Sequence, residues 1–162
     1  MREIKFKAKT TVKENEKYAF NNVWVEGDLI VSNRKYYIHP KANKVNVEGD
    51  LGKFIIMHEV QKDTVCQYTG LKDKNGKEIY EGDILKGFEY PYYADENHNY
   101  FVEVVWFENC PAFGMYTFKN PKSKVCGISE GNSDIIEGWQ ADEWEVIGNK
   151  FDKPELLEGG AE

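Results

Sequence analysis

Arginine is scarce in this chain of 162 residues, and its scarcity bears on the partners that the chain can bind. Only two of the 21 cationic residues are arginine, Arg2 and Arg34, and the net charge is −7. Proteins that hold a nucleic-acid backbone need a positive face and commonly use arginine to build it. The composition therefore argues against nucleic acid as a partner and favours proteins with basic surfaces.

Cysteines and long hydrophobic runs are also few. Cys66, Cys110 and Cys126 are widely spaced and odd in number, so they match no zinc or redox motif and predict free thiols in a reducing compartment. No apolar run approaches the roughly 20 residues that cross a bilayer as a helix. The opening residues 1–6 lack the apolar core of a signal peptide. We therefore expect a cytoplasmic protein that makes no contact with a membrane.

Long stretches of helical periodicity are missing, whereas aromatic residues make up 14% of the chain, a proportion that favours strands. Only one short helical turn is indicated, after Pro154. The predicted fold is mainly β: a single domain over residues 1–162, with a small β-barrel core at roughly 20–150, N- and C-terminal extensions, short helical turns and a tail over 151–162. Strands are expected within residues 4–9, 19–31, 35–38, 54–60, 100–108, 113–118 and 144–148.

The segment Gln67–Lys86 has the clearest local signals. Asn75-Gly76 is the dipeptide that most readily supplies two positive φ angles in a two-residue hairpin turn. The triplet Glu81-Gly82-Asp83 follows it, and similar triplets occur at 26–28 and 48–50. We expect each glycine to bend a strand of a curved sheet while the flanking carboxylates remain in water.

No combination of residues predicts catalysis. The run from Gly70 to Glu78 has the wrong glycine spacing for a phosphate-binding loop, and Glu78 stands where Ser or Thr would hold magnesium. His39, His58 and His98 lack metal-site spacing. The carboxylates of the glycine triplets are expected to be solvated, and no Ser or Cys has a nucleophile context. We therefore predict no enzyme activity, no catalytic residue, no metal site and no cofactor.

Six residues are candidates for binding. Tyr90, Tyr92 and Tyr93 lie in an aromatic loop over residues 87–99, which serves either as a recognition surface or as a lid folded back on the barrel. The other three, Trp24, Arg34 and Lys86, would supply stacking and charge to a small ligand.

Six blocks of the sequence match the pattern of a known family: residues 1–6, 24–29, 67–86, 105–108, 144–149 and 152–157. With these blocks the chain resembles the YopX family of phage and prophage proteins. The resemblance implies a β-barrel of the Src-homology-3-like type with extensions, a phage or prophage origin, a place in the cytoplasm of the bacterial host, and a homo-oligomer. It implies no established activity and no catalytic residues. The chain departs from the family at Lys7-Ala8-Lys9 and in the loop 87–99.

Three functions follow as hypotheses. The first is a non-enzymatic accessory protein that binds a host or phage protein, for which the aromatic loop and the acidic balance speak. The second is an oligomer that binds or sequesters a small, nucleotide-like ligand between protomers. The third is the binding of single-stranded nucleic acid, which the net charge disfavours most.

Overall fold

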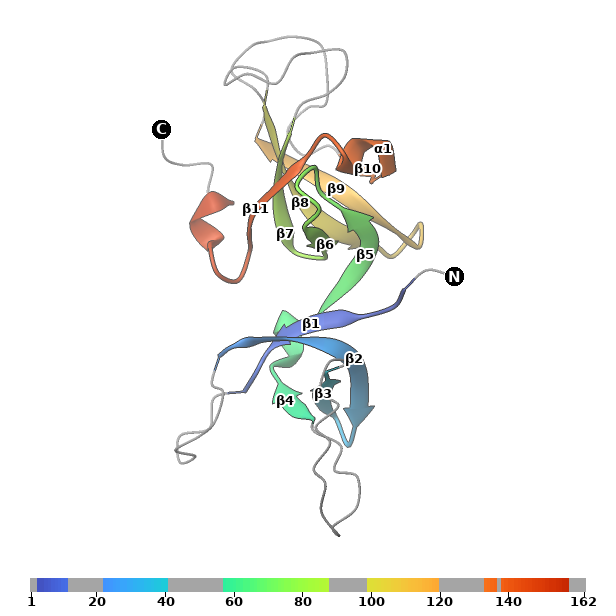
Figure 1. Cartoon of the computed structure of the whole chain (residues 1–162), viewed down its shortest axis with the longest axis vertical. Coiled ribbons are helices and arrows are strands. Elements are labelled where there is room, and N and C mark those ends of the chain that lie inside the picture. The colour runs from blue at the N-terminus through green and yellow to red at the C-terminus, as the bar shows by residue number, and fades with distance from the viewer. Residues whose placement is uncertain are drawn as a thin grey trace. The chain divides into compact units, whose positions relative to one another are not determined.

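The computed structural model describes residues 3–11, 22–40, 57–87, 99–119, 133–136 and 138–157. The chain divides into two compact units, residues 1–68 and 69–162 (Figure 1). Each unit has a hydrophobic core of its own. The mainly-β prediction is confirmed, because strands dominate both units. The expectation of a single domain over 1–162 stays a prediction. None of the helices within the described ranges is long and apolar enough to cross a membrane.

The N-terminal unit is built on an antiparallel sheet in which β1 lies between β2 and β5. Strand β5 enters this unit through Cys66 and Gln67, which pair with Lys7 and Phe6 of β1. The elements of the unit are β1 (Phe6–Lys9), β2 (Trp24–Ser32), β3 (Lys35–His39), β4 (His58–Val60), the 3-10 turn η1 (Lys62–Thr64) and the start of β5 (Cys66–Lys72).

Alternation along β1 produces the small core of this unit. Ala8 is fully buried and packs with Ile38 of β3 and Val60 of β4. The lysines on either side of Ala8 face the other way, as the period of two in a strand requires. Half-buried side chains complete the cluster: Phe6, Val25, Leu29, Tyr36 and Val65.

The C-terminal unit has the larger core, formed by one face of an antiparallel sheet in the order β10-β9-β8-β7-β11. Val102, Val104 and Leu85 are fully buried, and Met115 and Trp144 nearly so. The unit contains the rest of β5, β6 (Glu78–Tyr80), β7 (Asp83–Gly87), β8 (Tyr100–Phe107), β9 (Ala112–Lys119), β10 (Ser133–Ile135), α1 (Gly138–Ala141), β11 (Glu145–Asn149) and the 3-10 turn η2 (Pro154–Leu156).

The described strand pairs form two antiparallel sheets, and neither sheet closes on itself. The six-stranded order is β4-β3-β2-β1-β5-β6, and the five-stranded order of the C-terminal unit likewise ends in two edge strands. A closed barrel would pair its first strand with its last. The predicted barrel core over 20–150 is therefore replaced, among the described strands, by two open sheets.

Two of the hairpin turns among the described residues are built in different ways. Strands β2 and β3 are joined by Asn33 and Arg34 alone, with φ of 50° and 64°, as in a two-residue turn. The predicted turn at Asn75-Gly76 is in the right place, but of the two only Gly76 has a positive φ. Five residues separate β5 from β6 here, because the side chain of Asp73 organises a wider turn.

The glycine triplets are confirmed in part. Gly82 has a φ of 75° in the turn before β7, and Gly27 lies so close to β3 that the carbonyl carbon of His39 is 2.6 Å from the place of a Cβ. Asp28 is exposed, as expected. Asp83, however, is only 2% exposed and accepts a hydrogen bond from the Tyr80 N–H, so the expectation of a solvated carboxylate is wrong there. The third triplet, 48–50, lies outside the described residues.

The two units carry opposite net charges. Residues 1–68 hold 12 Lys and Arg against 9 Asp and Glu, a net charge of +3, whereas residues 69–162 hold 9 against 19, a net charge of −10. The overall value of −7 hides this division. Arguments from charge about binding partners therefore apply to each unit separately.

Candidate functional site

Of the six residues that are candidates for binding, the structure describes three, Trp24, Arg34 and Lys86, and it does not bring Trp24 and Arg34 together. Tyr90, Tyr92 and Tyr93 lie outside the described residues, so their role as recognition surface or lid stays a prediction. Trp24 begins β2, whereas Arg34 lies in the turn beyond its other end, so the two are separated by the length of a nine-residue strand. The sixth residue, Lys86, belongs to β7 in the C-terminal unit.

Trp24 is nevertheless surrounded by cations. Lys9 stands directly opposite Trp24 in the pairing of β1 with β2, and Lys7 is two residues along on the same face. The Nζ atoms of Lys7 and Lys9 lie 5.2 and 5.6 Å from the centre of the indole ring. Such cation–π contacts contribute about 0.5–1 kcal/mol each where water has access.

The same face continues along β1 in the other direction. Lys5 Nζ lies 5.0 Å from the ring centre of Tyr68. We call Lys5, Lys7, Lys9, Trp24 and Tyr68 the lysine–tryptophan face. It is not purely basic, because the exposed Glu26 stands opposite Lys7 in the strand pairing.

A second exposed surface lies on the C-terminal unit, on the side of the sheet turned away from the core. Core residues alternate along β8 and β9 with residues that face outward. Val105 stands opposite Gly114, which in turn stands opposite Ile135 of β10, so these positions share the outer face. Its apolar members form what we call the aromatic face: Phe101, Val105, Phe107, Tyr116, Phe118 and Ile135.

The aromatic face is accessible to solvent. Tyr116 and Ile135 are 41% and 43% exposed, and the other members are half-buried. The rings of Phe101 and Phe118 lie 6.4 Å apart. The ring of Phe107 lies over Gly114, where it occupies the space of a Cβ. A sheet face in contact with water is normally polar, so a row of aromatic side chains there marks a candidate interaction surface.

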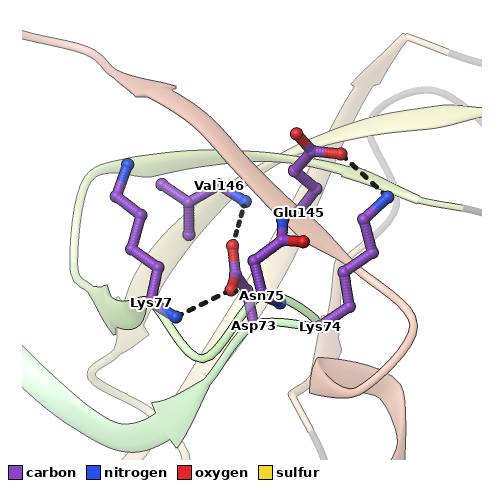
Figure 2. A network of polar contacts seen from close by, with 6 residues as sticks. All are labelled: Asp73, Lys74, Asn75, Lys77, Glu145 and Val146. Atoms are coloured by element: carbon purple, nitrogen blue, oxygen red, sulfur yellow. Dashed lines mark hydrogen bonds and ion pairs between the residues drawn. The ribbon is translucent and has the colours of Figure 1, made fainter.

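Asp73 is a buried carboxylate that accepts three backbone hydrogen bonds. It is 4% exposed, and its Oδ1 accepts hydrogen bonds from the N–H groups of Asn75 and Lys77 at 2.8 and 2.9 Å. Its Oδ2 accepts a third, at 3.0 Å, from the N–H of Val146 in β11. Figure 2 shows this network, together with the ion pair between Lys74 and Glu145 at 2.8 Å.

These contacts decide the chemistry of Asp73. Burial acts to raise its pKa, but the hydrogen bonds from Val146, Lys77 and Asn75, with the charge of Lys77, outweigh burial and lower the pKa. A carboxylate held ionised by three backbone donors is a poor proton donor near neutral pH. Asp73 therefore fastens the turn after β5 to β11 and is not suited to general acid catalysis.

The remaining reactive groups are dispersed. The described residues contain no cluster of three or more His, Cys, Asp or Glu side chains able to hold a metal ion. Cys66 is buried, with its Sγ 3.3 Å from the carbonyl of Thr64, and Cys110 is exposed, both as free thiols. The third cysteine, Cys126, lies outside the described residues.

Comparison with models of known protein families places the chain in one of them. The model described as YopX protein matches residues 5–158, which is nearly the whole length. The chain belongs to the YopX family. The resemblance inferred from the sequence blocks is thereby confirmed. A search of curated proteins finds no match, so the residues of this YopX protein carry the functional argument themselves.

The sequence indicated only some of the residues that form the two exposed faces of this YopX protein. Trp24 was singled out, but its contact with Lys7 and Lys9 depends on the register between β1 and β2. The aromatic face was missed, although its signal is present: Phe101, Val105 and Phe107 alternate with buried residues in a strand that is apolar on both sides. Such a strand usually indicates burial on both faces.

Proposed function

We propose that this YopX protein is a non-enzymatic accessory protein, encoded by a phage or prophage, that acts in the bacterial cytoplasm by binding a host or phage protein. The observation that carries the proposal is the aromatic face of the C-terminal unit, where Tyr116 and Ile135 are 41% and 43% exposed. Tyrosine and other large aromatic residues are enriched where proteins recognise one another, because they supply contact area at little cost in conformational entropy.

A pull-down from host lysate tests the proposal. Wild-type protein is compared with a Tyr116→Lys variant, a triple variant with alanine at positions 90, 92 and 93, and a Val31→Lys control. Val31 is an exposed apolar residue of the N-terminal unit. We expect wild type and the control to retain one specific protein that the Tyr116 variant loses. Loss in the triple variant would assign the tyrosine loop to the same interface. Empty partner lists for all four proteins would refute the proposed function.

A second function, binding of a small nucleotide-like ligand, is favoured by one observation. Trp24 offers an aromatic ring for stacking, and Lys7 and Lys9 lie 5.2 and 5.6 Å from its centre, close enough to contact phosphate oxygens of the same ligand. Native mass spectrometry of protein purified from infected cells should then show an extra mass that Trp24→Ala abolishes and Trp106→Ala retains. Identical native and denatured masses for the wild type would count against this function.

Three further expectations remain part of the proposal. The Src-homology-3-like type of fold, which the resemblance implies, is supported by the antiparallel strands of the C-terminal unit and by the irregularity between Val146 and Gly148 of β11, since bulges bend sheets. A homo-oligomer is proposed from the resemblance alone. Single-stranded nucleic acid stays the least favoured ligand, because Glu26 and Asp28 accompany the lysines of the N-terminal unit.

A further inference from the structure

The aromatic face has a border of charged residues that restricts what it can bind. Glu108 follows Phe107 in sequence, and Asp134 precedes Ile135 at the edge strand; both acids are exposed. On the side of β7, Lys86 stands opposite Phe101. Glu108 and Lys86 thus border the apolar side chains, whereas Asp134 stands opposite the core residue Met115 and holds its carboxylate at the edge of the sheet.

Part of the outer face is already covered by the C-terminal segment. Lys150 Nζ forms an ion pair with Glu103 Oε1 at 3.0 Å, and the Lys150 and Phe151 side chains come within 3.2 and 3.3 Å of the place of a Cβ at Gly82. Glu103 stands opposite Tyr116 in the strand pairing. This cover lies on the β7 side of Glu103, whereas Tyr116 and Ile135 on the β9–β10 side remain exposed.

The edge strand next to this surface is protected against pairing with another strand. The N–H of Ile135 donates to Oδ1 of Asp134 at 2.8 Å, whereas the N–H of Ile136 donates to the carbonyl of Phe113 in β9. Because N–H groups alternate in direction along a strand, that of Ile135 points away from the sheet and is occupied by a carboxylate. A bound partner is therefore expected to pack on the face of the sheet rather than extend it from β10.

We propose that the aromatic face docks a protein segment whose apolar side chains are flanked by lysine or arginine. The assignment rests on the proposed function and adds the chemistry of the partner. Apolar side chains of the segment would cover Tyr116, Phe118 and Ile135, while its cations would meet Glu108 at the end of β8 and the Asp134 carboxylate at the edge of the sheet. The C-terminal unit carries a net charge of −10, so its field attracts a basic partner and repels the same unit of a second copy.

Two synthetic peptides of 12 residues test the proposal with the full-length protein. One alternates leucine and lysine, and the other alternates leucine and glutamate. Calorimetric titration should show at least about tenfold tighter binding of the leucine–lysine peptide, because charge complementarity is added to the same apolar contact. Equal affinities, or tighter binding of the glutamate peptide, would overturn the proposal.

Substitutions at one position separate the apolar contribution from that of charge. Tyr116→Lys and Tyr116→Glu both remove the ring, but only the lysine variant also repels a basic partner. We expect the affinity for the leucine–lysine peptide to fall about tenfold in Tyr116→Lys and a few-fold in Tyr116→Glu. The Val31→Lys control, with a side chain 55% exposed in the wild type, should bind normally. Equal losses in the two Tyr116 variants, or no loss in either, would contradict the proposal.

Two further measurements exclude the alternatives. Asp134→Ala frees the Ile135 N–H. We expect this variant to bind the peptide as the wild type does or slightly more weakly, whereas tighter binding would indicate pairing at the edge of β10 and overturn docking on the face.

Sedimentation should show no dimer that the Tyr116 variants dissociate, since such a dimer would assign the face to a second copy. If the lysate partner is retained by Tyr116→Lys, the assignment of the surface fails while the proposed function stands.

Discussion

The two units of this YopX protein bury their residues in different ways. Among the described residues, the cluster of the N-terminal unit has three fully or nearly fully buried members, Ala8, Ile38 and Val60, surrounded by half-buried ones. The described part of the C-terminal unit buries eleven hydrophobic residues in one cluster. The described part of the first unit thus has the smaller cluster, and lysine–aromatic contacts lie on one face of its sheet. We therefore expect the C-terminal unit to be the more stable of the two.

The largest expected effects come from equal truncations in the two cores. Ile79 and Ile38 are both 0% exposed, one in each unit. Ile79→Ala should lower the free energy of unfolding of the C-terminal unit by about 4 kcal/mol, and Ile38→Ala that of the N-terminal unit by about 2–3 kcal/mol, because a small core relaxes more readily around a cavity. Hydrogen exchange measured on peptides from each unit would check this. Equal losses would remove the proposed difference.

The next largest effect is expected at Asp73. Asp73→Ala leaves the buried N–H of Val146 without its acceptor, which should destabilise the C-terminal unit by about 2–3 kcal/mol and leave the N-terminal unit unchanged. Urea denaturation would measure the loss in the free energy of unfolding, and hydrogen exchange of the β11 amides in the native protein would show that the loss lies in the C-terminal unit. Asp142→Ala, at an exposed position, is the control and should change stability by less than about 0.5 kcal/mol.

The units should also differ in how they respond to pH. The pKa of Asp73 is lowered from its ordinary value of 3.8, so its contribution is present above that value and is lost as the pH falls through the folded pKa. Acid should thus lower the stability of the C-terminal unit, and Asp73→Asn should flatten that dependence on pH.

The pKa of Lys35 is raised above 10.5 by its hydrogen bond and ion pair with Glu59, so a small loss of stability is expected in the N-terminal unit at alkaline pH. Unfolding midpoints across pH would measure both.

The smallest effect is a gain. Arg34 has a φ of 64° in the turn between β2 and β3, a conformation that glycine adopts more readily. Arg34→Gly should raise the stability of the N-terminal unit by about 0.5–1 kcal/mol, measured by thermal unfolding. Ser32→Gly, in a strand, should instead lower it. A loss of stability in Arg34→Gly would mean that the arginine side chain makes a contact that outweighs the strain.

Local pattern predicted the strands well because alternation and turn residues are encoded in neighbouring positions. The strand at 100–108 and its partner at 113–118 were found nearly in full as β8 and β9. The type of the turn at Asn75 was predicted less well, because the hydrogen bonds of the Asp73 side chain determine the backbone conformation there. The third of these hydrogen bonds comes from the N–H of Val146, 73 residues away. A rule that uses only neighbouring residues cannot identify a hydrogen-bond donor so distant in the sequence.

The candidate surfaces were predicted only in fragments for a similar reason. The net charge of −7 was read as a property of the whole chain, whereas the units carry +3 and −10. Trp24 was identified by its type, but Arg34 and Lys86 were grouped with it without a shared strand face. The aromatic face required knowing which residues of β8, β9 and β10 stand opposite one another. Register supplies that information, and single-sequence patterns do not.

The three hydrogen bonds of Asp73 also bear on the order in which the C-terminal unit folds. Two of its donors are two and four residues away and can engage as soon as the turn forms, whereas Val146 lies 73 residues along the chain. Closing so long a loop costs entropy before any contact rewards it. The turn is therefore expected to form early, with Oδ2 of Asp73 still hydrated. That oxygen exchanges water for the N–H of Val146 only when β11 pairs with the sheet, as one of the last strands to do so.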